Sequence, residues 1–215
     1  MVYLGDVVTI ETHHRVLKLV RLLESRPLSH IRNLHPGYFS LLVVFDPVRQ
    51  NHKRIEGFLR TYIEELDDLP LPETSTVEIP VCYGGEYGPD LDELAAIHEI
   101  SPERVIEVHS SAEYIVYFMG FVPGFAHLGG LPPELATPRL PSPRQAVPTG
   151  SVAIGGGHTG IYPMETPGGW RLIGKTPVPI FDRKLPKLSR LSIGDKVRFK
   201  PVPHDQFAVL QRQSQ

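Results

Sequence analysis

The chain has 215 residues, a formal net charge of −2, and 41% apolar against 21% charged residues, which is the composition of an ordinary globular protein. The near-neutral charge gives no reason to expect a nucleic-acid partner, and no apolar run approaches the ~20 residues that cross a bilayer. The single cysteine, Cys82, excludes an internal disulfide framework, so we expect a cytoplasmic protein.

The first third of the chain alternates between strand-like and helix-like segments. Helices are predicted over residues 14–24 and 51–66, and strands over residues 3–12, 28–34, 38–45 and 76–83. The order β-α-β-β-α-β is typical of the ferredoxin-like split, in which both helices cover one face of a single sheet. We therefore predict a small ferredoxin-like α/β domain over residues 1–76, with residues 69–74 as a linker before its last strand.

The rest of the chain favours strands after two short helices. These helices are predicted over residues 90–99 and from Ser101, since serine followed by proline is typical of a helix N-terminus. Strands are predicted over residues 113–121 and at the end of 191–199. Between Gly120 and Gly174, 12 glycines and 9 prolines among 55 residues exclude a long helix. We predict an all-β unit whose loops form a concave surface lined by aromatic and arginine side chains.

Two glycine-rich stretches each allow more than one interpretation. Residues 169–176 match the phosphate-loop pattern G-x-x-x-x-G-K-[ST], but their four variable positions are bulky and two prolines follow closely. We interpret this stretch as a strand followed by a turn. Residues 155–160 could bind an anion through backbone amides or could form a simple hairpin tip, and both interpretations stay open.

Candidate chemical groups are scattered through the second part of the chain. Two of the ten histidines, His13 and His14, are adjacent at the start of a predicted helix and face different ways. His109, His127 and His158 lack cysteine or carboxylate neighbours at zinc-ligand spacing, so we expect no metal site. His109 and His158 are acid–base candidates because imidazole titrates near neutrality. Arg139 and Arg144 could bind a carboxylate or a phosphate.

Several segments match the pattern of a known family. They are residues 117–125 (YFMGFVPGF), 128–131, 148–154, 159–163 and 167–174, with 79–91 and 108–111 upstream. These segments closely resemble the family of the 5-oxoprolinase B subunit, which includes the KipI-type inhibitor of a sporulation histidine kinase and allophanate hydrolase subunit 1. The chain departs from the family at Ala126-His127, His158 and Lys175, where family members usually have Pro-Tyr, Gln and Arg. These departures concern the substrate more than the fold.

The resemblance implies an α+β fold in which the N-terminal domain precedes a cyclophilin-like β-barrel over residues 77–215. It also implies two partners, the A and C subunits of 5-oxoprolinase, of which the second has a related barrel architecture. Together the three would hydrolyse 5-oxo-L-proline to L-glutamate at the expense of ATP, with this chain as a non-autonomous subunit. Whether ATP contacts this chain stays open.

The site prediction combines these residues with the resemblance. We predict that His158 and His109 act as acid–base groups. We predict substrate-binding roles for Phe121, Phe125, Arg139, Arg144, Thr159, Tyr162, Trp170 and Lys175, with Arg144 and Lys175 as anion anchors. Two alternatives remain: a KipI-type inhibitor that binds a sensor histidine kinase and blocks its autophosphorylation, and an allophanate hydrolase or urea carboxylase-related subunit.

Overall fold

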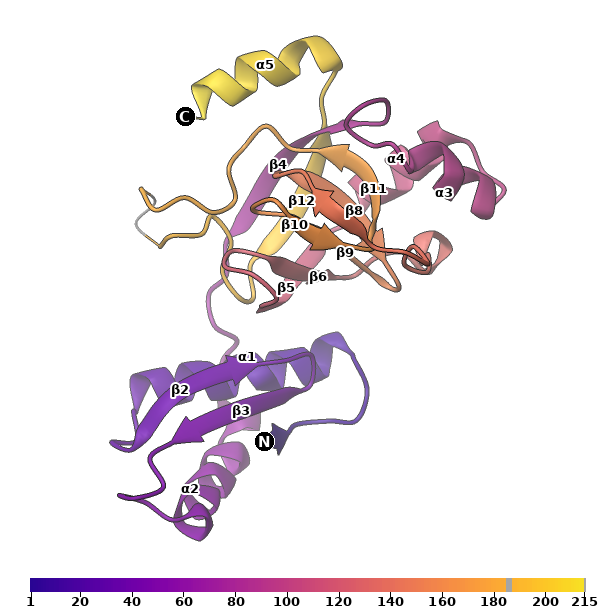
Figure 1. Cartoon of the computed structure of the whole chain (residues 1–215). Coiled ribbons are helices and arrows are strands. Elements are labelled where there is room, and N and C mark those ends of the chain that lie inside the picture. Colours follow the sequence, from indigo (N-terminus) through magenta and orange to yellow (C-terminus); the bar gives the residue numbers. More distant parts are fainter. Residues whose placement is uncertain (185–186, 215) are drawn as a thin grey trace. The chain divides into compact units, whose positions relative to one another are not determined.

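The computed structural model describes residues 1–184 and 187–214 and forms two compact units, Met1–Thr74 and Ser75–Gln215 (Figure 1). Within the described part of the chain, no helix is long and apolar enough to cross a membrane. The described chain thus combines a small sheet-and-helix unit with a larger unit built on a closed β-barrel.

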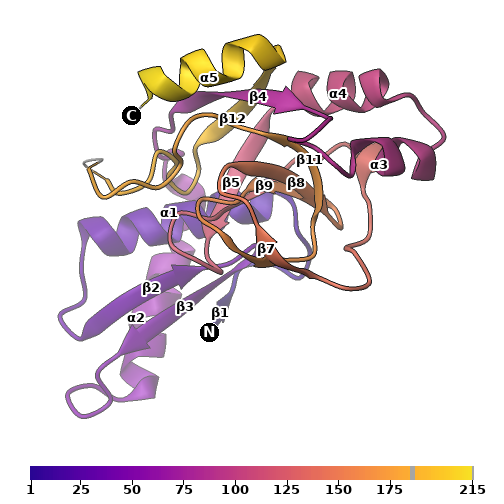
Figure 2. The same ribbon diagram turned by 45° about the horizontal axis from the view of Figure 1, so that its top comes forward.

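The N-terminal unit is a three-stranded antiparallel sheet with two helices on one face. Its elements are β1 (Val2–Tyr3), α1 (Ile10–Ser25), β2 (Ile31–Pro36), β3 (Ser40–Phe45), α2 (His52–Glu64) and the short 3₁₀ helix η1 (Leu66–Asp68), and the sheet order is β1-β3-β2. Leu41 and Val43 of β3 are buried with Leu19 of α1 and Leu59 of α2. Both views show the two helices behind the sheet (Figures 1 and 2). The sheet therefore buries one face and leaves the other open.

The start of α1 differs from the prediction of a strand over residues 3–12. The strand ends at Tyr3, and the helix begins at Ile10 because the Thr9 side chain accepts a hydrogen bond from the Thr12 N–H at 3.1 Å. A capping threonine satisfies one of the free amides of the first helical turn. This cap outweighs the strand-like alternation of the segment.

The last strand of the predicted ferredoxin-like order lies in the other unit. Residues 76–83 do form a strand, β4 (Thr76–Tyr83), but it pairs with barrel strands β12 and β11. Its second half, Ile79 and residues 81–83, is buried on both faces, which suits a strand inside a covered barrel better than a sheet edge. The described N-terminal sheet therefore has three strands, and a ferredoxin-like domain is not confirmed.

The second unit is a mixed α+β structure around a closed barrel of seven strands in the order β11-β4-β12-β5-β6-β9-β8. Its further elements are α3 (Leu91–Ile97), α4 (Pro102–Ser111), β5 (Tyr114–Met119), β6 (Ala126–Gly129), the 3₁₀ helix η2 (Pro133–Leu135), β7 (Arg144–Val147), β8 (Ser151–Gly155), β9 (His158–Ile161), β10 (Thr166–Gly168), β11 (Arg171–Lys175), β12 (Lys196–Pro201) and α5 (His204–Gln213). The β4–β12 pairing is parallel, and β7 pairs with β10 in a separate two-stranded sheet. The barrel core is one apolar cluster that includes side chains of α3 and α4.

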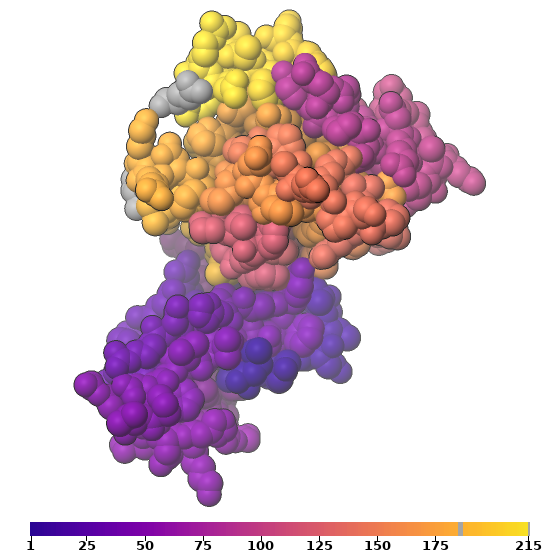
Figure 3. All heavy atoms as spheres, in the orientation of Figure 1, coloured from indigo at the N-terminus to yellow at the C-terminus, as the bar shows by residue number. Residues whose placement is uncertain are grey.

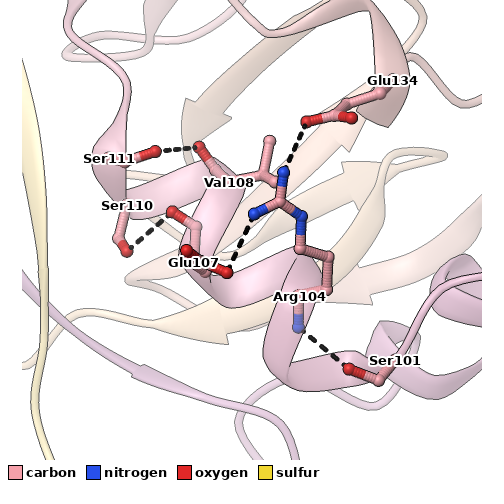
Figure 4. A network of polar contacts seen from close by, with 7 residues as sticks. All are labelled: Ser101, Arg104, Glu107, Val108, Ser110, Ser111 and Glu134. Atoms are coloured by element: carbon pink, nitrogen blue, oxygen red, sulfur yellow. Dashed lines mark hydrogen bonds and ion pairs between the residues drawn. The ribbon is translucent and has the colours of Figure 1, made fainter.

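Helix α4 is held at both ends by polar contacts (Figure 4). The Ser101 hydroxyl accepts a hydrogen bond from the Arg104 N–H at 3.2 Å, as the sequence predicts for a capping serine. The Arg104 guanidinium contacts Glu107 at 2.9 Å and Glu134 of η2 at 3.7 Å. Exposed ion pairs of this kind add little stability. The helix packs against the barrel through the buried Val105 and Val108, and its last turn carries the buried His109.

Candidate functional site

A cavity of about 280 Å³ opens on the barrel unit where the glycine-rich loops meet. Its lining residues are Phe121, Phe125, His127, Arg139, Pro143, Tyr162, Pro167, Gly168, Gly169 and Trp170. They belong to β6, to β10 and to the loops that precede β6, β7, β10 and β11. Salmon and orange residues of this part of the chain form much of the visible face of the barrel unit (Figure 3). Loops that are distant in sequence therefore converge on one concave surface.

Aromatic rings form the walls of this cavity around Phe125. The buried Phe125 ring makes edge-to-face contacts with three other rings. The centroid distances are 5.2 Å to Tyr162, 5.5 Å to Trp170 and 5.7 Å to Phe121, and each angle between ring planes is 84° or 85°. Edge-to-face packing of this kind fixes ring orientations. The wall is therefore rigid before any ligand arrives.

Phe121 stands at the rim of the cavity in an unusual backbone conformation. Its φ is +78° and its side chain is 65% exposed. A left-handed backbone is costly for a bulky residue and concentrates at binding and catalytic sites. The strained loop therefore presents a large apolar ring to solvent beside the cavity, which is a feature expected of a ligand or partner contact.

His127 supplies a neutral polar group among these rings. Its ring stacks on Phe118 at 4.1 Å and lies against Phe125 at 4.9 Å. Burial lowers the pKa of His127 to about 4, and the charges of His158 and Arg139 act in the same direction. At pH 7 the imidazole is neutral, so it can donate one hydrogen bond and accept another.

Arg139 brings positive charge to the same cavity. Its guanidinium lies 5.9 Å from the centre of the Trp170 ring, a cation–π geometry. The pKa of the half-buried His158 is lowered by burial and then by the charge of Arg139. Among the residues that the structure describes, no carboxylate lies within ion-pair distance of Arg139. The guanidinium is therefore available to an anionic group of a ligand.

His109 and Thr159 lie in the barrel core, outside the cavity lining. The His109 nitrogens Nδ1 and Nε2 lie 2.8 Å from the Tyr83 hydroxyl and 2.9 Å from the Thr159 hydroxyl. The Thr159 hydroxyl donates its proton to the Ala153 carbonyl at 3.0 Å, so it must accept the proton of His109 Nε2. The Tyr83 hydroxyl then donates to Nδ1, and this fixes the neutral tautomer.

Burial reinforces that neutral state. It lowers the pKa of the fully buried His109 to about 3, because a charged imidazole loses its hydration there. The ring is also packed against Phe199 at 4.6 Å. His109 therefore joins α4 to β9 through a directed chain of hydrogen bonds.

Arg144 and Lys175 also lie apart from this cavity. Arg144 Nη2 binds the buried Asp90 carboxylate at 2.6 Å, and the second oxygen of that carboxylate accepts the Leu172 N–H at 2.6 Å. Arg144 therefore ties β7 to β11 and to the start of α3. Lys175 lines a neighbouring cavity of about 280 Å³. The Tyr162 side chain lines both cavities.

The two glycine-rich stretches both belong to antiparallel strand pairs of the barrel. Residues 171–175 form β11, which pairs antiparallel with β8 and β4, so the interpretation of residues 169–176 as a strand is confirmed. Residues 155–160 form the tip of the β8–β9 hairpin, in which Gly155 pairs with His158 and Gly156, in the turn, has a φ of +63°. No group of three His, Cys, Asp or Glu side chains among residues 1–184 and 187–214 could hold a metal ion.

The structure thus gathers part of the predicted site residues. Phe121, Phe125, Arg139, Tyr162 and Trp170 line one cavity, with His158 close to Arg139. The prediction missed His127. Two signals in the sequence could have found it: the strand alternation of residues 126–129, and the departure from the family's Pro-Tyr at this position.

Comparisons with known proteins agree with this fold. Residues 1–191 match the family model "Carboxyltransferase domain, subdomain C and D". The chain is 37% identical to the 5-oxoprolinase B subunit of Bacillus subtilis over 100% of its length and 93% of that protein. It is 44% identical to the 5-oxoprolinase B subunit of Escherichia coli O157:H7 over 90% of its length and 88% of that protein.

A solved structure extends the likeness to three dimensions. The crystal structure of TTHA0988 is 36% identical and matches 94% of this chain with a TM-score of 0.82, while this chain spans only 39% of that longer chain. Identity and coverage of this extent establish a common family. The chain therefore belongs to the carboxyltransferase-domain family of subdomains C and D, in the group that includes the 5-oxoprolinase B subunit.

Proposed function

We propose that this chain is the B subunit of an ATP-dependent 5-oxoprolinase, which hydrolyses 5-oxo-L-proline to L-glutamate together with the A and C subunits. The observation that carries this proposal is the similarity to two proteins named as B subunits of 5-oxoprolinase over 100% and 90% of this chain. Opening an unstrained five-membered lactam requires an energy source, so ATP acts at the level of the complex. The barrel, in this proposal, is of the cyclophilin-like type.

The cavity has the chemistry that 5-oxo-L-proline requires. The substrate is a small ring with an apolar edge, a carboxylate and a lactam amide. The Phe125 and Trp170 rings suit the ring edge, and the Arg139 guanidinium suits the carboxylate. The neutral His127 imidazole suits the lactam, since it can pair with either the N–H or the C=O group.

The acid–base role in this proposal belongs to the histidines near Arg139. His158 is half-buried, and burial and the Arg139 charge lower its pKa, so it is a neutral proton acceptor at pH 7. His109 takes a positioning role, because it lies in the core and both of its ring nitrogens are engaged by Tyr83 and Thr159. Its effect on the site passes through β9, which begins at His158.

The test is 5-oxoproline-dependent glutamate formation by this chain reconstituted with the A and C subunits and ATP. A hydrogen bond to a charged group contributes ~1.5–3 kcal/mol, so we expect Arg139→Ala to raise the KM for 5-oxoproline by about ten- to a hundredfold. The KM for ATP should not change. Arg212→Ala is the matched control, because Arg212 is an exposed arginine on α5 outside the cavity.

A substrate analogue separates the binding of the carboxylate from a general effect of the substitution. The lactam 2-pyrrolidone lacks the carboxylate. Arg139→Ala should therefore weaken the binding of 2-pyrrolidone, measured as competitive inhibition, far less than it weakens the binding of 5-oxoproline. Unchanged kinetics in an Arg139→Ala, His127→Ala double variant would remove this cavity from the reaction. No turnover in the complete wild-type complex would refute the function itself. The relatives named above include no kinase inhibitor, and we do not propose that alternative.

A further inference from the structure

His127 and His158 lie on the same face of three neighbouring barrel strands. His127 of β6 lies opposite Gly160 of β9, and His158 of β9 lies opposite Gly155 of β8. The side chains of directly paired residues lie on one face of a sheet, and so do those of residues two apart along a strand. His158 and Gly160 are two apart on β9. Both imidazoles therefore belong to one face.

This face is the outer face of the barrel, and the Trp170 ring covers part of it. Ile161, which follows Gly160 and so points the other way, belongs to the barrel core. A Cβ atom added at Gly155 would lie 2.5 Å from the Trp170 ring, and one added at Gly160 would lie 3.1 Å from it. The ring therefore lies over the two strand positions that are directly opposite the two histidines.

The same ring brings a third basic side chain to this face. The Arg139 guanidinium and the centre of the His127 ring each lie 5.9 Å from the Trp170 ring centre. Strand β8 has no titratable side chain, and the Tyr162 hydroxyl keeps its proton because burial raises its pKa. Among the residues that the structure describes, no Asp or Glu lines this cavity. The charge of the cavity therefore favours an anionic ligand.

These basic groups oppose one another's protonation. Burial, and then the charges of His158 and Arg139, lower the pKa of His127, and burial and the Arg139 charge lower the pKa of His158. The neighbour of His127 on β5 is the apolar Phe118 ring. An anion bound among these groups has the opposite effect, because a nearby negative charge favours the protonated imidazole. Anion binding and proton uptake are therefore coupled at this cavity.

We propose that the cavity binds both carboxylates of L-glutamate, one at Arg139 and one at His127 and His158, and that one histidine takes up a proton. This inference rests on the proposed function, in which Arg139 binds the carboxylate of 5-oxo-L-proline and His127 pairs with the lactam. Hydrolysis breaks the lactam C–N bond. The oxygen of water joins the carbonyl carbon, and both protons of water end on the nitrogen as an ammonium group. The second carboxylate therefore forms beside the histidines.

Ring opening thus changes what the histidines must match. The lactam of 5-oxo-L-proline is neutral and suits a neutral imidazole, whereas the second carboxylate of L-glutamate suits a protonated one. L-Glutamine has the same carbon chain with a neutral amide in place of that carboxylate, so it lacks the group that favours proton uptake. The cavity should therefore distinguish a dicarboxylate from its amide, and more strongly at low pH.

The experiment is isothermal titration calorimetry of the full chain with L-glutamate and L-glutamine at pH 6.5, in two buffers of different ionisation enthalpy. Neither buffer contains phosphate or carboxylate, because these anions would compete for the cavity. The difference in binding enthalpy between the buffers gives the number of protons taken up. We expect at least about half a proton with L-glutamate. L-Glutamine should take up far less and bind at least about tenfold more weakly.

The affinity should also depend on pH. A linked proton changes the affinity by up to about tenfold per pH unit, so L-glutamate should bind roughly tenfold more tightly at pH 6 than at pH 7.5. The His127→Gln, His158→Gln double variant keeps polar side chains that do not titrate near neutrality, and its binding should lose both the proton uptake and this pH dependence. His52→Gln is the matched control, because His52 is an exposed histidine on α2 outside the cavity lining.

Three results would each overturn the proposal: no binding of L-glutamate at millimolar concentration, equal affinity for the two ligands, or proton uptake that persists in the double variant. The comparison of the two ligands on wild type stays decisive even if the double variant does not fold. Turnover by the complete complex tests the proposed function separately. A complex that hydrolyses 5-oxoproline while L-glutamate binds without proton uptake would refute this inference alone.

Discussion

The buried His109 makes the stability of the barrel depend on pH in a way that one substitution should remove. Its pKa is lowered from 6.5 to about 3 by burial. Between these two values the unfolded chain binds a proton that the folded chain does not, so stability falls as pH falls. The slope is about 1.4 kcal/mol per pH unit. From pH 7.5 to pH 5 this single group should therefore cost about 2 kcal/mol, most of it below pH 6.5.

The perturbation is His109→Phe, which keeps an aromatic ring against Phe199 and removes both side-chain hydrogen bonds. The Tyr83 hydroxyl loses its acceptor in the core, and Thr159 loses a donor but still binds the Ala153 carbonyl. A buried polar group without a partner costs about 1–3 kcal/mol. We expect the variant to be less stable than wild type by roughly 2–4 kcal/mol at pH 7.5.

The assay is urea unfolding of both proteins at several pH values between 7.5 and 5, with the free energy of unfolding extrapolated to water. The difference between wild type and His109→Phe should shrink by about 2 kcal/mol over this range, since only wild type has the titrating group. Tyr83→Phe is the control, because it removes one hydrogen bond and keeps His109 buried. A difference that stays constant with pH would refute the assignment of His109 as a neutral core group.

Two further predictions concern other parts of the barrel unit. Arg144→Ala leaves the Asp90 carboxylate, which is 7% exposed, without its cation. Because Arg144 itself is partly exposed, we expect a loss of about 2 kcal/mol in the free energy of unfolding. An unchanged urea midpoint would show that this ion pair does not stabilise the fold. Gly88→Ala places a methyl group against the backbone of β11, whereas Gly157→Ala meets no atom within 4 Å, so the first should lower the thermal midpoint by several degrees and the second should not.

Local signals in the sequence were enough to place most helices and strands. Helix α4 begins at Pro102 after the capping Ser101, and β4 has the predicted bounds. The pairing of β4 could not be predicted, because its partner β12 lies far along the chain and strand pattern alone does not choose a sheet. Helix α5 was not predicted either, since its one buried side chain, Phe207, depends on a stacking contact with Tyr87 at 4.3 Å.

The kinds of residue in the candidate site were predictable from the sequence, but which of them contact one another was not. Arg139 and Arg144 look alike in the sequence, both flanking the segment 141–143. What distinguishes them is Asp90, which is distant in sequence and binds Arg144 alone. Charge pairing across the fold therefore decides which arginine can meet a ligand, and a single sequence does not contain that information.

The buried network and the cavity are joined through one strand. His109 forms a hydrogen bond with Thr159 of β9. The residue before Thr159, His158, lies close enough to Arg139 for that charge to lower its pKa. The residue after Thr159, Gly160, pairs with His127 of β6. A shift of β9 along its axis would therefore move His158 relative to Arg139 and to His127 of β6. The activity of an enzyme can fall substantially when a catalytic group is displaced by about 1 Å. If the cavity is the site of the proposed reaction, His109 acts on activity without contacting substrate. Its loss should then lower the kcat of the reconstituted complex even where the barrel remains folded.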